Sequence, residues 1–165
     1  MKDKANYGWI ELTKLDELDN HPIAGVKFEI VLGDNVVETL TTNAQGYAKS
    51  KDLVCGTYTV REKDNPTGYV EEISVTDSKV TPLKVNSLTF KNRPIQGKIR
   101  IFKSDELTKE ALADAEFTVT RISGLPSHNG EGDGDVVAVM VTGTDGIAET
   151  ELLTYGKYRD RKSVV

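Results

Sequence analysis

The sequence predicts an all-β protein built from two antiparallel β-sandwiches in tandem, the second of them incomplete at its C-terminus. Three observations lead to this prediction. Short segments alternate apolar and polar residues with the period of two that is typical of half-buried strands. Turn residues, mainly Gly, Asn and Asp, separate these segments. The pattern of the first half also returns in the second half, which indicates an internal duplication.

The strands of the first copy are predicted from this alternation. The turns between them include GDN, NAQG and DNPTG, in which Gly, Asn or Asp accepts a positive φ. Short strands at this spacing, over about ninety residues, are typical of an antiparallel sandwich. No segment predicts a long helix, although DELTKEALADAEF (105–117) contains enough helix formers for one short helical turn. The predicted strands lie near residues 8–16, 26–32, 36–42, 47–53, 57–63, 70–76 and 82–92.

The internal repeat sets the domain boundary. The segment IELTKLDELDNHPIAGVKFEI (10–30) aligns with IRIFKSDELTKEALADAEFTV (99–119). Matches farther along need a longer offset, so the second copy carries an insertion, which falls in SGLPSHNGEGDGD (123–135). A Pro and a Gly punctuate NRPIQG, the segment between the copies. We therefore expect one domain at residues 1–95 and a second at 96–165.

The composition argues against several classes of function. The net charge of −5 disfavours a nucleic acid or an anionic membrane as partner, because both attract a basic surface. No apolar run reaches the length of a membrane span, and MKDKANYGW has no apolar signal-peptide core. The single cysteine, Cys55, cannot form an internal disulfide and is interpreted as a small residue packed near a turn. The acidic loop HNGEGDGD lacks the ligand spacing of a calcium site, so no metal or cofactor is predicted.

Three strands of the first copy carry a polar residue where their apolar row continues. Lys14 continues the row of GWIELTKLD, Glu62 that of YTVREK, and Asn92 that of SLTFKN. Each of them alone would be interpreted as a rim residue whose polar end reaches water. Together, on the first, fifth and last predicted strands, they indicate a cluster inside the sandwich.

Such a cluster has a specific chemistry. Desolvation lowers the pKa of a buried lysine and leaves a nucleophilic neutral amine. A buried carboxylic acid stays protonated more easily and can hydrogen-bond a carboxamide oxygen. The amine then attacks the carboxamide carbon, and ammonia leaves. We therefore predict an isopeptide bond between Lys14 and Asn92, assisted by Glu62. The bond forms once per molecule, so the chain is not expected to be an enzyme.

The order of several segments carries a family resemblance. K-x-D, PIAGVKFEI, T-x-x-x-G, GTYTVREK, NPTGY and FKN follow one another over most of residues 8–93. This order resembles the Cna-B or SpaA-like domains of Gram-positive surface proteins, which are prealbumin-like β-sandwiches. In that family the isopeptide lysine, the assisting glutamate and the asparagine lie at the positions of Lys14, Glu62 and Asn92. Cys55 departs from the pattern, because a proline-like turn residue is common there.

The resemblance implies a structural function at the cell surface. It suggests a stalk or repeat module of a cell-wall adhesin or pilin, whose partners are neighbouring repeats of a longer protein. Host matrix or glycan would be bound through other domains. One alternative is a module that itself binds host protein or glycan through exposed aromatics, although packing is favoured for two of the candidates Tyr7, Trp9, Tyr47 and Tyr69, namely Trp9 and Tyr69. Another is an accessory domain of a larger carbohydrate-active surface enzyme.

The second copy lacks parts of the predicted site. Lys103 takes the position of Lys14, but Lys162 stands where Glu62 would map, and no closing strand or asparagine follows. No isopeptide bond is expected there. The tail DRKSVV (160–165) matches nothing in the first copy and can be back-translated into a common sequencing adaptor. We therefore expect a truncated gene with a non-native tail; the alternative is a genuine short C-terminus.

Overall fold

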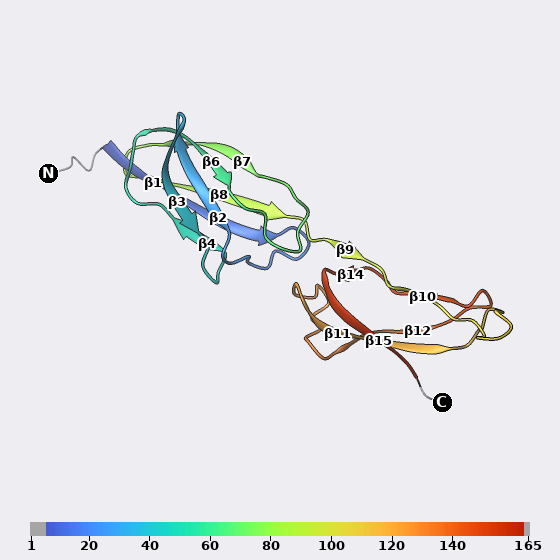
Figure 1. Cartoon of the computed structure of the whole chain (residues 1–165). Helices are drawn as coiled ribbons and strands as arrows, with labels where there is room; N and C mark the ends of the chain where they lie inside the picture. Colours follow the sequence, from blue (N-terminus) through green and yellow to red (C-terminus); the bar gives the residue numbers. More distant parts are fainter. Residues whose placement is uncertain (1–5, 164–165) are drawn as a thin grey trace. The chain divides into compact units, whose positions relative to one another are not determined.

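The computed structural model describes residues 6–163, and these residues form strands and loops without an α-helix (Figure 1). The described residues therefore contain no helix that is long and apolar enough to span a membrane. The chain divides into two compact units, Met1–Pro94 and Ile95–Val165, each described by itself below. The fold class predicted from the sequence, all-β with β-sandwiches in tandem, is confirmed.

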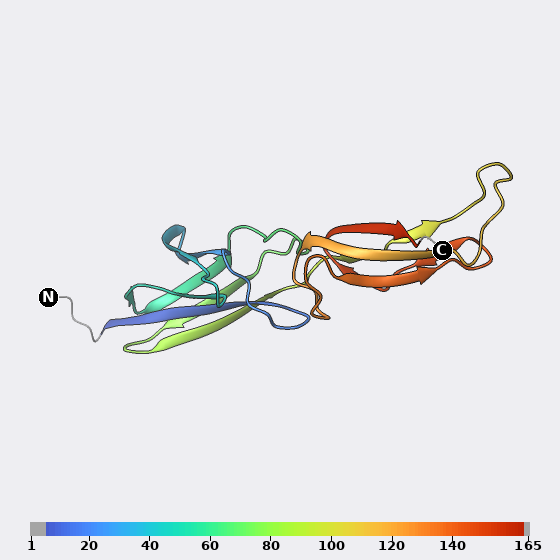
Figure 2. The ribbon, with the colours of Figure 1, turned by 90° about the horizontal axis from the view of Figure 1, so that it is seen from below.

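Unit 1 is a sandwich of two four-stranded sheets (Figure 2). In the first sheet β1 is central, with β8 along one side and the short strands β4 and β5 along the other. The second sheet has the order β3-β2-β6-β7. The strands are β1 (Tyr7–Asp16), β2 (Lys27–Leu32), β3 (Asn35–Thr41), β4 (Tyr47–Lys49), β5 (Leu53–Val54), β6 (Gly56–Glu62), β7 (Val75–Val80) and β8 (Val85–Asn92).

The first and last strands of unit 1 are parallel neighbours. β1 pairs with β8 from Trp9 opposite Val85 to Asp16 opposite Asn92, and the other strand pairs are antiparallel. The chain crosses from one sheet to the other between β7 and β8, which allows β8 to run in the direction of β1. The sandwich is thus antiparallel except at the pair that joins its two ends.

Two predicted strands of unit 1 differ from the observed ones. The strand expected over 47–53 is interrupted at residues 50–52, and β4 and β5 pair with different stretches of β1. The strand expected over 70–76 lies instead at Val75–Val80. The amide of Val70 bonds to the carbonyl of Arg93, so this part of the chain follows the end of β8 and not β6.

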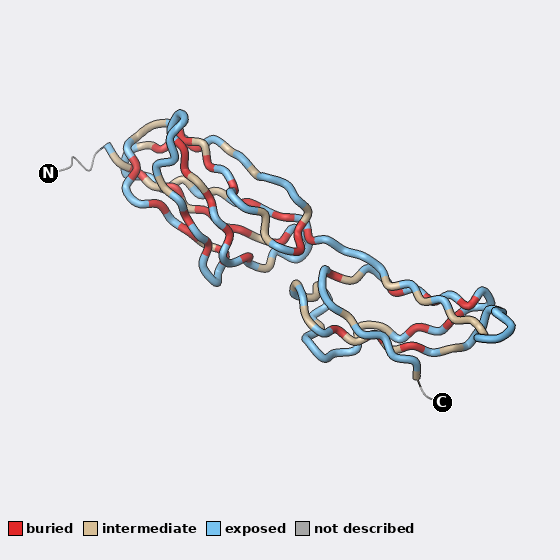
Figure 3. Tube along the Cα trace, viewed as in Figure 1, coloured by how far each residue is buried: buried red, intermediate tan, exposed pale blue. Residues whose placement is uncertain are grey.

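The core of unit 1 lies between the two sheets (Figure 3). Every second residue of β1 is buried, as the alternation in the sequence predicts. The rings of Phe28 and Phe90 meet with centroids 4.7 Å apart. Each large apolar side chain buried in this way stabilises the fold by about 1.5–3 kcal/mol. The fully covered apolar residues are Ile10, Leu12, Phe28, Ile30 and Val60.

Unit 2 repeats the first part of this plan. β11 lies between β12 and β15, as β2 lies between β3 and β6. β9 and β10 together take the place of β1 and pair with β14 and β13. Within residues 95–163 no strand corresponds to β7 or β8. The strands are β9 (Gln96–Gly97), β10 (Arg100–Phe102), β11 (Glu116–Gly124), β12 (Val136–Val141), β13 (Ile147–Glu149), β14 (Leu153–Thr154) and β15 (Gly156–Lys162).

The helical turn considered for residues 105–117 does not form. The carboxylate of Asp105 accepts the amides of Leu107 and Thr108, and the chain reverses through a positive φ at Lys109. A short side chain that bonds to the next amides favours a turn over a helix. The hydrogen bonds of Asp105 therefore favour a turn here, although the segment is rich in helix-forming residues.

Candidate functional site

Lys14, Glu62 and Asn92 meet inside unit 1. They come from β1, β6 and β8, so that both sheets contribute. The amine Nζ of Lys14 donates to Glu62 Oε2 at 2.8 Å and also to Asn92 Oδ1. The amide Nδ2 of Asn92 donates to Glu62 Oε1 at 3.2 Å. The exposed fractions of the three residues are 0%, 2% and 3%, so the cluster is closed to bulk water.

Strand alternation brings these side chains to one place. Each lies two residues beyond a buried apolar neighbour on its own strand, as the sequence analysis expected. Phe28 lies opposite Glu62 in the pairing of β2 with β6, and its ring centroid is 5.7 Å from Lys14 Nζ. The aromatic pair of Phe28 and Phe90 forms an apolar wall beside the amine.

The burial changes the acid–base behaviour of the amine. Desolvation lowers the pKa of Lys14 from its usual value, while the hydrogen bond and the charge of Glu62 oppose this effect. The lowered pKa increases the share of the neutral amine near neutral pH. A neutral amine in contact with a carboxamide is a nucleophile beside an electrophile.

The glutamate faces a different atom from the one expected. The sequence predicts Glu62 as an acid that hydrogen-bonds the amide oxygen of Asn92. In the structure Glu62 Oε1 faces the amide nitrogen of Asn92, and Oε2 faces the amine of Lys14. One carboxyl group thus lies between the amine of Lys14 and the amide nitrogen of Asn92.

A fourth polar residue was missed by the sequence analysis. Asn65 accepts a hydrogen bond from Asn92 Nδ2 through its Oδ1 at 3.0 Å. It belongs to the loop after β6, where no strand alternation indicates which way a side chain points. The only available signal was its place in the NPTGY segment of the resemblance.

Comparison with known families identifies the fold. The sequence model of the SpaA family, described as a prealbumin-like fold domain, matches residues 8–94 and 97–161. The chain belongs to the SpaA prealbumin-like fold family. The resemblance inferred from the sequence is confirmed. A comparison with curated protein sequences finds no match.

Several solved structures resemble this SpaA-family chain. The Bacillus anthracis TIE protein is 28% identical with a TM-score of 0.77, over 96% of this chain and 28% of that one. A streptococcal ancillary pilin is 23% identical with a TM-score of 0.50, over 98% and 54%. BcpA, the major pilin subunit of Bacillus cereus, is 18% identical with a TM-score of 0.53, over 96% and 60%. The chain thus spans only part of each of these proteins.

The second SpaA-like unit does not assemble the same cluster. Phe117 lies opposite Lys162 in the pairing of β11 with β15, as Phe28 lies opposite Glu62 in unit 1. The alignment that places a lysine at the glutamate position is therefore correct in space. Lys162 is exposed, and in the described part of unit 2 no strand corresponds to the one that carries Asn92.

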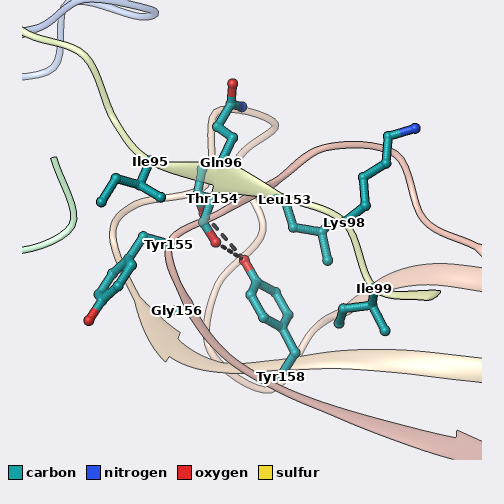
Figure 4. A pocket seen from close by; sticks show the side chains of 10 residues that line it. Ile95, Gln96, Lys98, Ile99, Leu153, Thr154, Tyr155, Gly156 and Tyr158 are labelled. Carbon is teal, nitrogen blue, oxygen red and sulfur yellow. Dashed lines mark hydrogen bonds between the residues drawn. The ribbon is translucent and has the colours of Figure 1, made fainter. Parts of the chain in front are cut away.

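A cleft in unit 2 lies at the position that the turn between β7 and β8 covers in unit 1. In unit 1 the turn between β7 and β8 covers the start of β1, with Lys84 O accepting the amide of Trp9. The corresponding part of unit 2 is an open cleft of about 240 Å³ (Figure 4). Tyr158 lines it and donates to Thr154 O at 2.8 Å. The cleft is therefore an uncovered part of the sandwich core.

The other candidate residues have structural contacts. Trp9 is half-buried; its Nε1 donates to Asp52 at 2.9 Å and its ring faces the amine of Lys49. Tyr69 is buried, with 4% of its surface exposed. Cys55 is half-buried beside the turn into β6. These contacts agree with the packing interpretation of Trp9, Tyr69 and Cys55.

The hydroxyl of Tyr47 also has a structural contact. It donates to Glu11 at 3.0 Å, across the pairing of β1 with β4.

The carboxylates of the acidic loop of unit 2 bond within the loop and to neighbouring residues. Asp133 accepts from the buried guanidinium of Arg121 at 3.0 Å, and Asp135 accepts the amide of Gly132 at 2.8 Å. Glu131 accepts the hydroxyl of Ser127. These contacts hold the loop at the end of β11 and agree with its interpretation as a hairpin loop.

Proposed function

We propose that this chain is a structural repeat module of a cell-surface adhesin or pilin, and that unit 1 is closed by a self-formed isopeptide bond between Lys14 and Asn92. The observation that carries the proposal is the buried contact between the amine and the carboxamide, bridged by both oxygens of Glu62. Burying the amine as an ammonium is costly, and the reaction converts it into an uncharged amide.

The proposed reaction balances within these three side chains. The neutral amine of Lys14 attacks Cγ of Asn92, and the new N–C bond replaces the bond from Cγ to Nδ2. One proton of the amine passes to Glu62 through Oε2, and Glu62 delivers a proton to the leaving nitrogen through Oε1. That nitrogen departs as ammonia, and Glu62 ends in its starting state. No cofactor takes part.

Intact mass measurement tests the bond. We expect the folded chain to be lighter than its calculated mass by one ammonia, and fragmentation to find Lys14 joined to Asn92. Glu62→Gln keeps the size of the side chain but removes its proton transfer, so the full mass should return. Lys103→Ala is the matched control and should keep the mass loss. A folded wild-type chain of full calculated mass would disprove the bond.

The setting of the module is proposed from its relatives. The family is prealbumin-like, and two of the similar structures are described as pilins. We propose an extracellular, cell-wall-associated location, with neighbouring repeats of a longer protein as partners and any host matrix or glycan contact made by other domains. An antibody against unit 1 should label intact cells of the source organism. Labelling only after lysis would contradict the location.

A further inference from the structure

We propose that Asn65 is a positioning residue for isopeptide formation. It orients the carboxamide of Asn92 and accepts a hydrogen bond from the nitrogen that leaves. This inference rests on the proposed function, since it concerns the same reaction. Asn65 lies in the loop between β6 and β7, outside the three strands that carry the reacting groups. It nevertheless contacts the reacting carboxamide directly.

The contacts of Asn65 determine which of its ends faces the site. Its Nδ2 donates to the backbone oxygen of Tyr69 at 2.9 Å and to that of Pro66 at 3.3 Å. Backbone oxygens only accept hydrogen bonds, so the amide nitrogen must face them. The oxygen Oδ1 therefore points toward Asn92. The loop thus presents an acceptor to the site.

This acceptor fixes the orientation of Asn92. One hydrogen of Nδ2 reaches Glu62 Oε1 at 3.2 Å, and the other reaches Asn65 Oδ1 at 3.0 Å. With both hydrogens engaged, Oδ1 of the same carboxamide faces the amine of Lys14. A carboxamide rotated by half a turn would lose both bonds and present its nitrogen to the amine. Asn65 and Glu62 together therefore hold the electrophile in the reactive orientation.

Asn65 also lies on the outward side of the site. The three reacting side chains are buried, whereas Asn65 is only half-buried. Together with Gly25 and Thr67 it lines a surface hollow of about 250 Å³. The nitrogen that leaves Asn92 is already hydrogen-bonded to a residue that borders this hollow. Asn65 is thus the residue that connects the reacting carboxamide to this surface hollow.

The test compares two substitutions in the full chain. Asn65→Ala removes the acceptor toward Asn92 and the donor toward Tyr69. Asn65→Asp keeps an acceptor toward Asn92 and removes only the donor. Asn43→Ala is the control, because Asn43 also organises a turn by accepting the amides of Gln45 and Tyr47. The chain is recovered unfolded and at full mass from inclusion bodies, and the reaction is started by dilution.

Two readouts separate folding from the reaction. Fluorescence of Trp9, the single tryptophan of the chain, follows the folding of unit 1. Intact mass follows the loss of ammonia. We expect Asn65→Ala to fold with the wild-type fluorescence change but to lose ammonia about ten- to a hundredfold more slowly. Asn65→Asp should be clearly faster than Asn65→Ala, and Asn43→Ala should match the wild type.

The outcomes distinguish the two proposals. A wild-type chain that folds without losing ammonia overturns the bond and, with it, the role of Asn65. If the wild type reacts and Asn65→Ala reacts at the same rate, the bond stands and the role of Asn65 is wrong. If Asn65→Asp is as slow as Asn65→Ala, the residue acts by holding its loop through Tyr69, and the positioning role is again overturned.

Discussion

Lys14 is a lysine in a position that strand alternation reserves for an apolar side chain. Burial disfavours its ammonium form, and the carboxyl of Glu62 only partly offsets this. The free amine therefore binds its proton less tightly in the folded chain than in the unfolded chain. Lowering the pH from 10.5 to the pKa of Lys14 in the folded chain therefore destabilises the unreacted fold.

The Glu62→Gln variant isolates this effect, since it should leave Lys14 unreacted and without its acidic partner. The pKa of Lys14 is lowered by folding, so the unfolded chain binds more protons between the folded pKa and the ordinary value of 10.5. We expect the free energy of unfolding to rise with pH across this window and to level off above it.

Urea unfolding from about pH 7 to about pH 10 measures the trend up to just below the ordinary lysine pKa. The double variant Glu62→Gln/Lys14→Met removes the amine at similar size and serves as control. The slope with pH should be smaller in the double variant. Equal slopes would show that Lys14 keeps its ordinary pKa.

At the same scale, the site was predictable where the side chain lies on a strand. Lys14, Glu62 and Asn92 follow a period of two, which determines the face to which each points. Asn65 follows no period. Its direction is set by two backbone oxygens of its own loop, at Pro66 and Tyr69, which only the folded chain brings together. The contact of Glu62 with the amide nitrogen of Asn92 was likewise not predictable from the sequence, because it depends on side-chain rotamers.

At the scale of elements, the segment from β7 through β8 distinguishes the two units among the described residues. A Cβ at Gly8 of β1 would lie 2.4 Å from the backbone oxygen of Thr81, which belongs to the turn between β7 and β8. A Cβ at the equivalent Gly97 would meet nothing within 4 Å. The same glycine is thus required for close approach in unit 1 and unconstrained by neighbours in the described part of unit 2.

This difference gives a matched pair of substitutions. Gly8→Ala should destabilise unit 1 by about 1–3 kcal/mol, because the backbone of the turn between β7 and β8 must move. Gly97→Ala should leave unit 2 unchanged or stabilise it by about 0.5 kcal/mol, since alanine loses less backbone entropy in a strand. Denaturant unfolding followed by Trp9 fluorescence for unit 1 and by circular dichroism for the whole chain measures both. Equal losses at the two positions would contradict the argument.

Backbone exposure differs between the units as well. β1 has strand neighbours on both sides, whereas β10 pairs with β13 alone among the described strands. β6 lies between β2 and β7, whereas β15 has β11 as its one partner within residues 6–163. We expect amides of β10 and β15 to exchange with solvent faster than those of β1 and β6, and proteases to cut first after residue 97. Uniform protection along the chain would contradict this expectation.

Most strands followed from the alternation, and the exceptions have local causes. The strand expected over 70–76 failed because Tyr69 is buried and pairs with Pro94, which takes this stretch to the end of β8. The parallel pairing of β1 with β8 was not predictable from short-range pattern, since it depends on where the chain crosses between sheets. A turn forms at Asp105 despite the helix propensity of the following residues, because its carboxylate accepts the amide of Leu107.

At the scale of the whole molecule, the proposed bond ties the ends of unit 1 together. It would link residues 78 positions apart. The loop-entropy relation used for disulfides gives about 4.5 kcal/mol for a loop of this length, mainly through the unfolded chain. We expect Glu62→Gln to lower the free energy of unfolding of unit 1 by roughly this amount. Guanidinium unfolding at neutral pH measures it, with Lys103→Ala as the unchanged control.

The parallel pairing of β1 with β8 also determines how unit 1 responds to a force applied at its two ends. Tension enters at Tyr7 and leaves beyond Asn92, and it shears the two strands along their shared register. A covalent link from Lys14 to Asn92 would carry this tension from one strand directly to the other. The residues between them would then stay slack. Their extended contour, about 260 Å at 3.3 Å per residue, would not be released. Under shear such a unit would behave as an inextensible link.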